Sequence, residues 1–252
     1  MAERKIDVLT LRWYEPATRS PDIASRWLEA ARRHLPEAMP RRFGDVEPLR
    51  GRLDRDGEDG FRRGLAEADT LFALAGKPPV HAGTLSARRP RHFGPTVSHT
   101  LRVAVDPNDE RVRRFALALA HPDMIYMSAS MAGGYTLDDD ELWGPPERPE
   151  EPFLAPLGDW LGLPPEPPSW CWFGPAYTRI LCRISLASLS SSRQSRPRAG
   201  AVDSIGGLLW TGGPWVEERL QARLSEVDPA RRHAPKMPGG LRRNLLQMLF
   251  SR

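Results

Sequence analysis

The sequence has very little cysteine and no long apolar run, and each shortage excludes a class of protein. Its 252 residues include only two cysteines, Cys171 and Cys182, too few for the disulfide framework of a small secreted protein. No stretch approaches the roughly 20 apolar residues that a membrane-spanning helix needs. Residues 1–13 lack the apolar core and cleavage site of a signal peptide and instead have a strand pattern. We therefore expect a cytoplasmic protein with no membrane partner.

Lysine is also scarce, since it supplies only three of the 36 basic residues. The net charge of +4 and the pI near 9.4 are typical of proteins that bind nucleic acid. However, so uniform a preference for arginine over lysine is more typical of a GC-rich coding sequence than of a phosphate-binding surface. Residues 136–169 hold nine acidic residues and one arginine, whereas residues 179–252 hold thirteen basic and five acidic residues. Charge that is polarised along the chain in this way steers the approach of charged partners. We therefore favour a charged protein partner over nucleic acid. Nucleic-acid binding through the arginines of 193–198 and 231–243 stays open as an alternative.

Apolar residues make up 40% of the chain, which is enough for a packed core. Proline is abundant: its 26 residues are about twice the typical share of roughly 5%. Residues 142–168 combine prolines and acidic residues with too many apolar side chains for a free linker. We predict that this segment is an ordered Pro-rich acidic loop within a single domain of residues 1–252.

Hydrophobic periodicity predicts alternating strands and helices. Strand patterns occur at residues 6–13, 70–75, 100–105, 125–131, 170–173 and 207–210. Helical spacing occurs after Ser20-Pro21, after Gly60, after Asp106-Pro107, and at residues 175–186, 216–227 and 241–249. Residues 188–198, rich in serine and arginine, are predicted to be a mobile loop. The fold class is therefore α+β: a mixed or antiparallel sheet with helices packed on one face, ferredoxin-like strand–helix–strand units and Pro-rich loops.

No catalytic, cofactor or metal motif rises above background. His81, His92 and His99 lack the spacing of metal ligands and are interpreted as loop or solvated residues, and His121 as a cation at a helix carboxyl end. The two cysteines are interpreted as buried thiols. The glycines around residues 206–213 lack the lysine and the single loop of a phosphate cradle, so turn glycines explain them better. We predict no catalytic residue, no cofactor and no metal.

The candidate binding residues lie together in the acidic part of the chain. Asp138, Asp139, Asp140 and Glu141 are contiguous, unlike the spaced acids of an EF-hand, and Trp143 follows them. An aromatic side chain surrounded by acidic residues has the layout of a protein–protein hot spot. We expect Trp143 to be presented at the surface and these five residues to bind a partner.

Two segments near the carboxyl end carry a family resemblance. Trp-Cys-Trp-Phe-Gly-Pro-Ala-Tyr at 170–177 leads into a predicted helix, and Gly-Gly-Leu-Leu-Trp-Thr-Gly-Gly-Pro occupies 206–214. This pattern resembles that of bacterial type VI and polymorphic-toxin immunity proteins. The resemblance implies an α+β cytoplasmic protein that binds and neutralises a cognate toxin without chemistry of its own. The alternatives are an enzyme whose site is dispersed in the sequence and an arginine-mediated nucleic-acid binder.

Overall fold

The computed structural model describes residues 4–16, 22–87, 96–138, 141–144, 167–175, 177–178 and 202–212. The strands are β1 (Arg4–Pro16), β2 (Arg42–Gly44), β3 (Gly51–Arg52), β4 (Leu71–Ala75), β5 (Val80–Ser86), β6 (Thr96–Val103), β7 (Tyr126–Asp138), β8 (Glu141–Trp143), β9 (Trp170–Phe173) and β10 (Leu208–Trp210). The helices are α1 (Ile23–His34), α2 (Leu53–Glu67) and α4 (Glu110–Ala118), with a short 3₁₀ turn η1 (Pro36–Ala38).

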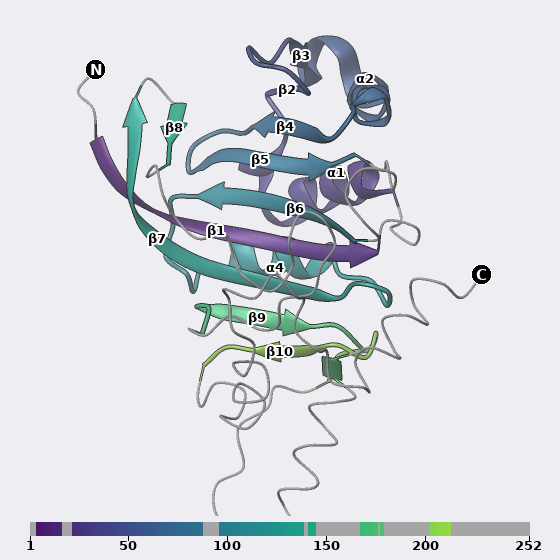
Figure 1. The fold of residues 1–252 in the computed structure, drawn as a ribbon, viewed down its shortest axis with the longest axis vertical. Helices are drawn as coiled ribbons and strands as arrows, with labels where there is room; N and C mark the ends of the chain where they lie inside the picture. The colour runs from purple at the N-terminus through teal and green to yellow at the C-terminus, as the bar shows by residue number, and fades with distance from the viewer. Residues whose placement is uncertain are drawn as a thin grey trace, which may run out of the picture.

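All ten strands of the described residues join one antiparallel sheet, so the α+β prediction is confirmed and the choice between a mixed and an antiparallel sheet is decided. The order is β10-β9-β7-β1-β6-β5-β4-β2-β3, and β8 pairs with β7 beside this path. Figure 1 shows the sheet in that order from β3 at the top to β10 at the bottom. The amino-terminal strand β1 therefore lies in the middle, between β6 and β7, and each neighbour runs antiparallel to it.

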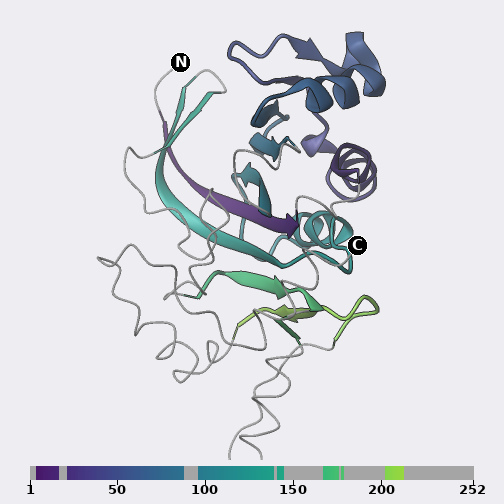
Figure 2. The same ribbon diagram turned by 45° about the vertical axis from the view of Figure 1, so that its right-hand side comes forward.

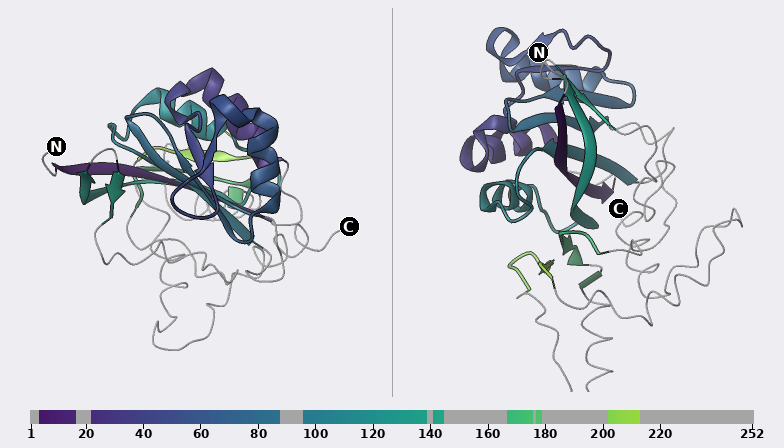
Figure 3. Two further views of the ribbon diagram at one scale, coloured as in Figure 1. Left: turned by 90° about the horizontal axis from the view of Figure 1, so that it is seen from above. Right: turned by 90° about the vertical axis from the view of Figure 1, so that its left-hand side faces the viewer.

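Helices α1, α2 and α4 lie on the same side of the sheet (Figure 3). The strand alternation of β1 explains this arrangement, because Leu9, Leu11 and Trp13 all point to one face and all belong to the main core. The indole of Trp13 meets Trp27 of α1 edge-on at 6.0 Å and Phe115 of α4 at 6.1 Å. Burial of these aromatic rings holds α1 and α4 against the centre of the sheet.

Helix α2 packs at the far end of the sheet, where Phe61 meets Phe43 of β2 and Phe72 of β4. The helix starts before the predicted position after Gly60, at Leu53. It is interrupted at Gly57, whose φ of 66° suits glycine.

The starts of α1 and α4 differ from the prediction by two or three residues. Asp22, not Ser20, caps α1 and accepts hydrogen bonds from the backbone N–H groups of Ala24 and Ser25. Asp109, not Asp106, caps α4 by accepting from the N–H of Arg111. In both places a second good capping residue lies within three positions, so the local pattern alone did not select between them.

Strands β9 and β10 bring the two segments of the family resemblance together. Leu209 pairs with Trp172 in the ladder, and the Trp172 Nε1–H donates to a carboxylate oxygen of Asp203 at 2.7 Å. The other oxygen of Asp203 accepts from the N–H of Gly207, which packs directly against the indole of Trp172. Gly206 has a φ of 85°, so the interpretation of this glycine as a turn residue is confirmed.

Several predicted elements lie outside the described residues. They are most of the Pro-rich loop of 142–168, most of the helix of 175–186, the loop of 188–198, and the helices of 216–227 and 241–249. Within the described part of the chain, no helix is both long enough and apolar enough to cross a membrane.

The close contact between Gly207 and Trp172 predicts that Gly207→Ala destabilises the protein. The new Cβ would overlap the indole ring, so the free energy of unfolding should fall by about 1–3 kcal/mol. Gly44→Ala is the matched control, because its Cβ would meet its nearest neighbour, the Val46 carbonyl oxygen, at an ordinary 3.6 Å and should change stability by less than about 0.5 kcal/mol. Urea denaturation of both variants measures the difference, and equal midpoints would contradict the prediction.

Candidate functional site

The predicted binding residues lie on a hairpin at one end of the sheet. Here the first residues of β1, the last residues of β7 and all of β8 form a three-stranded extension, which we call the arm. Figures 1 and 3 show the arm at the end of the sheet away from the helices, and Figure 2 shows the strong bend of β1 and β7 toward it. No helix among the described residues covers it.

A β-bulge marks the place where the arm leaves the body of the sheet. Ile6 pairs with Tyr135 and Val8 pairs with Ala132, so Asp7 faces two residues of β7. These two are glycines, and Gly134 has a φ of 82°, a conformation that other residues rarely adopt. A bulge of this kind bends the strand and increases its twist, which redirects the hairpin.

A small apolar cluster of its own supports the arm. Val8, Ala132 and Tyr135 are buried there, and Ile6 and Leu142 pack against them. This cluster is separate from the main core under the helices. The arm is therefore packed on one side and does not rely on strand pairing alone.

The structure brings Asp138 and Trp143 to the same face of the arm. Trp143 pairs with Thr136, and Asp138 lies two residues beyond Thr136 on β7, which places both on the face opposite the apolar cluster. Trp143 is 59% exposed, so its predicted presentation at the surface is confirmed, and Asp138 is also exposed. Glu141 pairs with Asp138 in register, while Asp139 and Asp140 lie outside the described residues.

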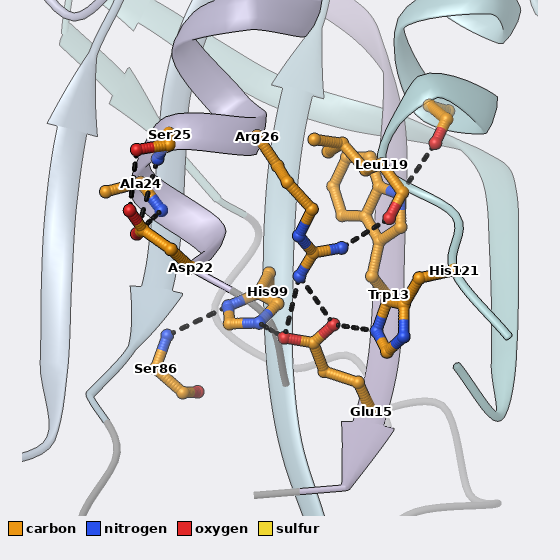
Figure 4. A network of polar contacts seen from close by, with 11 residues as sticks. Trp13, Glu15, Asp22, Ala24, Ser25, Arg26, Ser86, His99, Leu119 and His121 are labelled. Carbon is orange, nitrogen blue, oxygen red and sulfur yellow. Dashed lines mark hydrogen bonds and ion pairs between the residues drawn. The ribbon is translucent and has the colours of Figure 1, made fainter. Parts of the chain in front are cut away.

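A second candidate site, absent from our sequence-based expectations, surrounds Glu15 near the end of β1. Its side chain is fully buried on the helix side of the sheet, in the same alternation as Trp13. Figure 4 shows Arg26 of α1, His99 of β6 and His121, which follows α4, converging on its carboxylate. Four separate parts of the chain therefore meet at one buried charge.

Hydrogen bonds surround the Glu15 carboxylate on both oxygens. Oε1 accepts from His99 Nε2 at 3.0 Å, and Oε2 accepts from His121 Nε2 at 2.7 Å. One nitrogen of Arg26, Nη2, lies 3.1 Å from Oε1 and 2.8 Å from Oε2. The other terminal nitrogen of Arg26 donates to the carbonyl oxygen of Leu119, which ties α1 to the end of α4.

The tautomer of His99 follows from its second contact. Its Nδ1 lies 3.2 Å from the backbone N–H of Ser86 and must accept that hydrogen bond. Nε2 therefore carries a proton, which it donates to Glu15.

The pKa of Glu15 lies well below its usual range. Burial by itself would raise the pKa of this carboxyl group. The hydrogen bonds from His121 and His99, together with the positive charge of Arg26, oppose burial and more than offset it. The ionised form of Glu15 is therefore the form that the fold requires.

The described contacts of this cluster do not include the one that nucleophilic catalysis needs. A Ser–His–Glu triad requires a hydrogen bond from the serine hydroxyl to the histidine, but Ser86 contacts His99 through its backbone N–H. The hydroxyl of Ser86 instead donates to the carbonyl oxygen of Ser98. Within the described residues, no group of three or more histidine, cysteine, aspartate or glutamate side chains is placed to hold a metal ion. The contacts that are present join β1 of the sheet to α1 and to the end of α4.

One histidine interpretation was wrong. His99 lies in β6, is 1% exposed and is neither a loop residue nor a solvated one, whereas His121 follows α4 and is buried against Glu15, a contact that the sequence did not predict. A signal was present in the sequence: Leu9, Leu11, Trp13 and Glu15 continue one alternation, which puts a carboxylate on the buried face. Because a buried carboxylate needs cationic or donor partners, that position predicts arginine or histidine nearby.

The structure also locates the other residues considered from the sequence. Cys171 is buried in β9, as predicted, and Cys182 lies outside the described residues. His81 lies in β5 and is partly exposed, and His92 is outside the described residues.

Comparison with known proteins returned no match: no family model, no curated protein and no solved structure is similar to this chain.

The contacts of Glu15 predict a strong effect of Glu15→Gln. The substitution preserves the shape but removes the charge that compensates the largely buried Arg26, so the free energy of unfolding at pH 7 should fall by about 3–5 kcal/mol. Glu110→Gln is the control, because Glu110 is 60% exposed and its ion pairs on α4 should contribute no more than about 1 kcal/mol. Equal losses in urea denaturation would contradict the role assigned to Glu15.

The lowered pKa of Glu15 also predicts how this effect changes with pH. A carboxyl group whose pKa is lower in the folded state contributes stability above its unfolded pKa of about 4.3 and loses it as the pH falls through the folded pKa. The difference in unfolding free energy between the wild type and Glu15→Gln should therefore be constant near neutral pH and shrink below about pH 4. A difference that stayed constant into this acidic range would show that the charge of Glu15 is not responsible.

Proposed function

We propose that this chain is a cytoplasmic immunity protein that binds and occludes a cognate bacterial toxin and has no catalytic activity of its own. The observation that carries the proposal is the exposure of Trp143 on an arm that no described helix covers. A tryptophan that is 59% exposed on a packed hairpin offers a large contact area to a partner at a small cost in conformational entropy.

The surroundings of Trp143 favour a protein partner with a basic surface. Asp138 lies on the same face of the arm and pairs with Glu141, and Asp139 and Asp140 stand between these two residues in the sequence. Acidic residues around an aromatic centre increase the association rate with a basic partner and contribute to specificity. A toxin that acts on nucleic acid would have such a basic surface, because its substrate is an anion.

We also propose a finer description of the fold. Strands β6 and β7 are joined through α4 and run in the same direction on either side of β1, which supports a ferredoxin-like strand–helix–strand unit. We further propose that residues 1–252 form one domain and that residues 142–168 are an ordered loop of that domain.

An enzymatic function would have to use the cluster around Glu15, where two histidines meet a carboxylate. Two contacts weigh against it: the Ser86 hydroxyl donates away from His99, and the Glu15 oxygens are occupied by Arg26 and the two histidines. The arginines that would support nucleic-acid binding, in 193–198 and 231–243, lie outside the described residues. Toxin binding is therefore the function that the geometry supports best.

Co-expression with the product of a neighbouring toxin-like gene tests the proposal. The chain should restore growth of bacteria that express the toxin, and the two proteins should co-purify as a stable complex. If the pair neither co-purifies nor protects the cells, the proposed function is wrong.

We expect Trp143→Ala to weaken binding to that toxin about 10- to 100-fold, as loss of a hot-spot side chain does. The stability of the protein should change by less than about 0.5 kcal/mol, because Trp143 is mostly exposed. Val46→Ala is the matched control, since Val46 is a 70% exposed apolar residue between β2 and β3, outside the arm, and should leave binding unchanged. Calorimetric titration measures all three affinities, and equal binding by the wild type and Trp143→Ala would remove Trp143 from the interface.

The acidic residues should act mainly on the association rate. In the triple variant Asp138→Asn, Asp139→Asn, Asp140→Asn, the association rate constant at low salt should fall about 10-fold and lose most of its salt dependence. Asp59→Asn, which removes a 99% exposed carboxylate from α2, should leave both unchanged. Stopped-flow measurements at several salt concentrations distinguish the two variants, and an unchanged salt dependence in the triple variant would contradict a steering role.

A further inference from the structure

The bulge at the base of the arm turns an acidic side chain across the neighbouring strand. The position that a Cβ of Gly133 would occupy lies 2.8 Å from Oδ1 of Asp7, so the Asp7 carboxylate fills the space of a side chain at position 133. Apart from its chain neighbours, no atom of the described residues lies within 4 Å of the corresponding position on Gly134. Bulges often aim a side chain at a functional place, which makes this carboxylate a candidate for recognition.

Asp7 lies on the same face of the arm as Trp143. Ile6 packs in the apolar cluster, so its neighbours Lys5 and Asp7 point to the opposite face. Lys5 pairs with Thr136, which pairs with Trp143 on its other side. Because residues directly opposite in a ladder share a face, these side chains form one continuous surface.

Met131 belongs to this surface as well. Its neighbour Ala132 is buried in the apolar cluster, so Met131 points the opposite way. We call this surface the arm face and define it by Lys5, Asp7, Met131, Thr136, Asp138 and Trp143.

The Asp7 carboxylate stands between the two large apolar side chains of the arm face. It lies over Gly133, two residues from Met131 on β7 and one row of the ladder from Trp143. Each of these steps along the strand is roughly 7 Å, which long side chains span. One group of a partner could therefore contact all three residues.

The arm face is open. Trp143 is 59% exposed and Met131 is 39% exposed, and Asp7 is exposed between them. Among the described residues, five large apolar side chains are exposed, so two of the five flank this single carboxylate. Such grouping of exposed apolar side chains is typical of an interaction surface.

The charges of the arm face favour a cation beside Asp7. None of the hydrogen bonds or ion pairs of the described residues engages the Asp7 carboxylate. Lys5 donates from its Nζ to Oγ1 of Thr136, one row away. Asp7 and Asp138 together outnumber Lys5, so the arm face has one negative charge in excess.

We propose that an arginine of the cognate toxin binds Asp7 and lies between Met131 and Trp143. A guanidinium group fits a carboxylate with two parallel hydrogen bonds, and its plane stacks on an indole ring, which an ammonium group does not match. The two apolar side chains would exclude water from the ion pair, as they do around a binding hot spot. This inference rests on the proposed function and adds to it the chemical group that the arm recognises.

Calorimetric titration with the product of the neighbouring toxin-like gene tests the contact. Asp7→Asn should weaken binding at least about 10-fold, because the guanidinium loses its counter-ion, and Met131→Ala should weaken it about 3- to 10-fold. Asp45→Asn removes an exposed carboxylate between β2 and β3, and Leu71→Ala truncates a 52% exposed side chain of β4. Both of these matched controls should bind like the wild type.

Replacing the surface arginines of the toxin by alanine, one at a time, identifies the partner residue. One replacement should weaken binding to the wild type at least about 10-fold but change binding to Asp7→Asn by less than about 3-fold, as expected for a directly coupled pair. Urea denaturation should give Asp7→Asn the midpoint of the wild type, since its carboxylate is exposed. If Asp7→Asn does not fold, Met131→Ala and its control Leu71→Ala decide the question.

The proposed contact is overturned if Asp7→Asn folds and binds like the wild type, or if Met131→Ala does. An equal loss in Asp45→Asn would overturn it too, because the effect would then be long-range attraction. In each case a loss of binding in Trp143→Ala would leave the proposed function in place. If the wild-type chain does not bind the toxin at all, the contact and the proposed function are both wrong.

Discussion

The buried charge of Glu15 imposes the strictest requirement in this structure. Removing a carboxylate from water costs several kcal/mol unless partners replace the lost hydration. Those partners are Arg26, His99 and His121, and each belongs to a different part of the chain. The position of α1, the register of β6 and the exit from α4 are therefore constrained together by one side chain. The aromatic contacts of Trp13 provide apolar burial beside it, but the charge specifies the geometry.

The two ends of β1 have contrasting roles that follow from what covers them. The carboxyl-terminal half lies under α1 and α4, where Leu11 and Trp13 enter the main core. The amino-terminal half runs past the bulge at Gly133 and Gly134 into the arm, which has only a small cluster of its own. The hairpin leaves Trp143 exposed beside the packed body of the sheet. This division of one long strand underlies the proposed binding function.

Much of the fold could be predicted because a strong hydrophobic periodicity fixes the secondary structure of a segment largely independently of what the segment packs against. The alternation at residues 6–13, the apolar run at residues 70–75 and the helical spacing of Val112 and Phe115 correspond to β1, β4 and α4 of the structure. Strand β5 was not predicted, since Gly83 and its small or polar neighbours have little intrinsic strand signal. Gly83 is needed there because the ring of Trp27 lies 3.3 Å from the position that a Cβ would occupy. A local pattern could not reveal a neighbour that is distant in sequence.

The sequence by itself determined the α+β alternation, the aromatic core and the exposed tryptophan of the arm, because these depend on residues close together in the chain. Only the tertiary structure decided the partners of Glu15. His99 and His121 lie 84 and 106 residues further along the chain, and nothing local in their surroundings distinguishes them from solvated histidines. They reach the carboxylate because strand register places β6 beside β1 and helix packing places the end of α4 above it. Strand register and helix packing between distant segments are properties of the whole fold, so no short stretch of the sequence determines them.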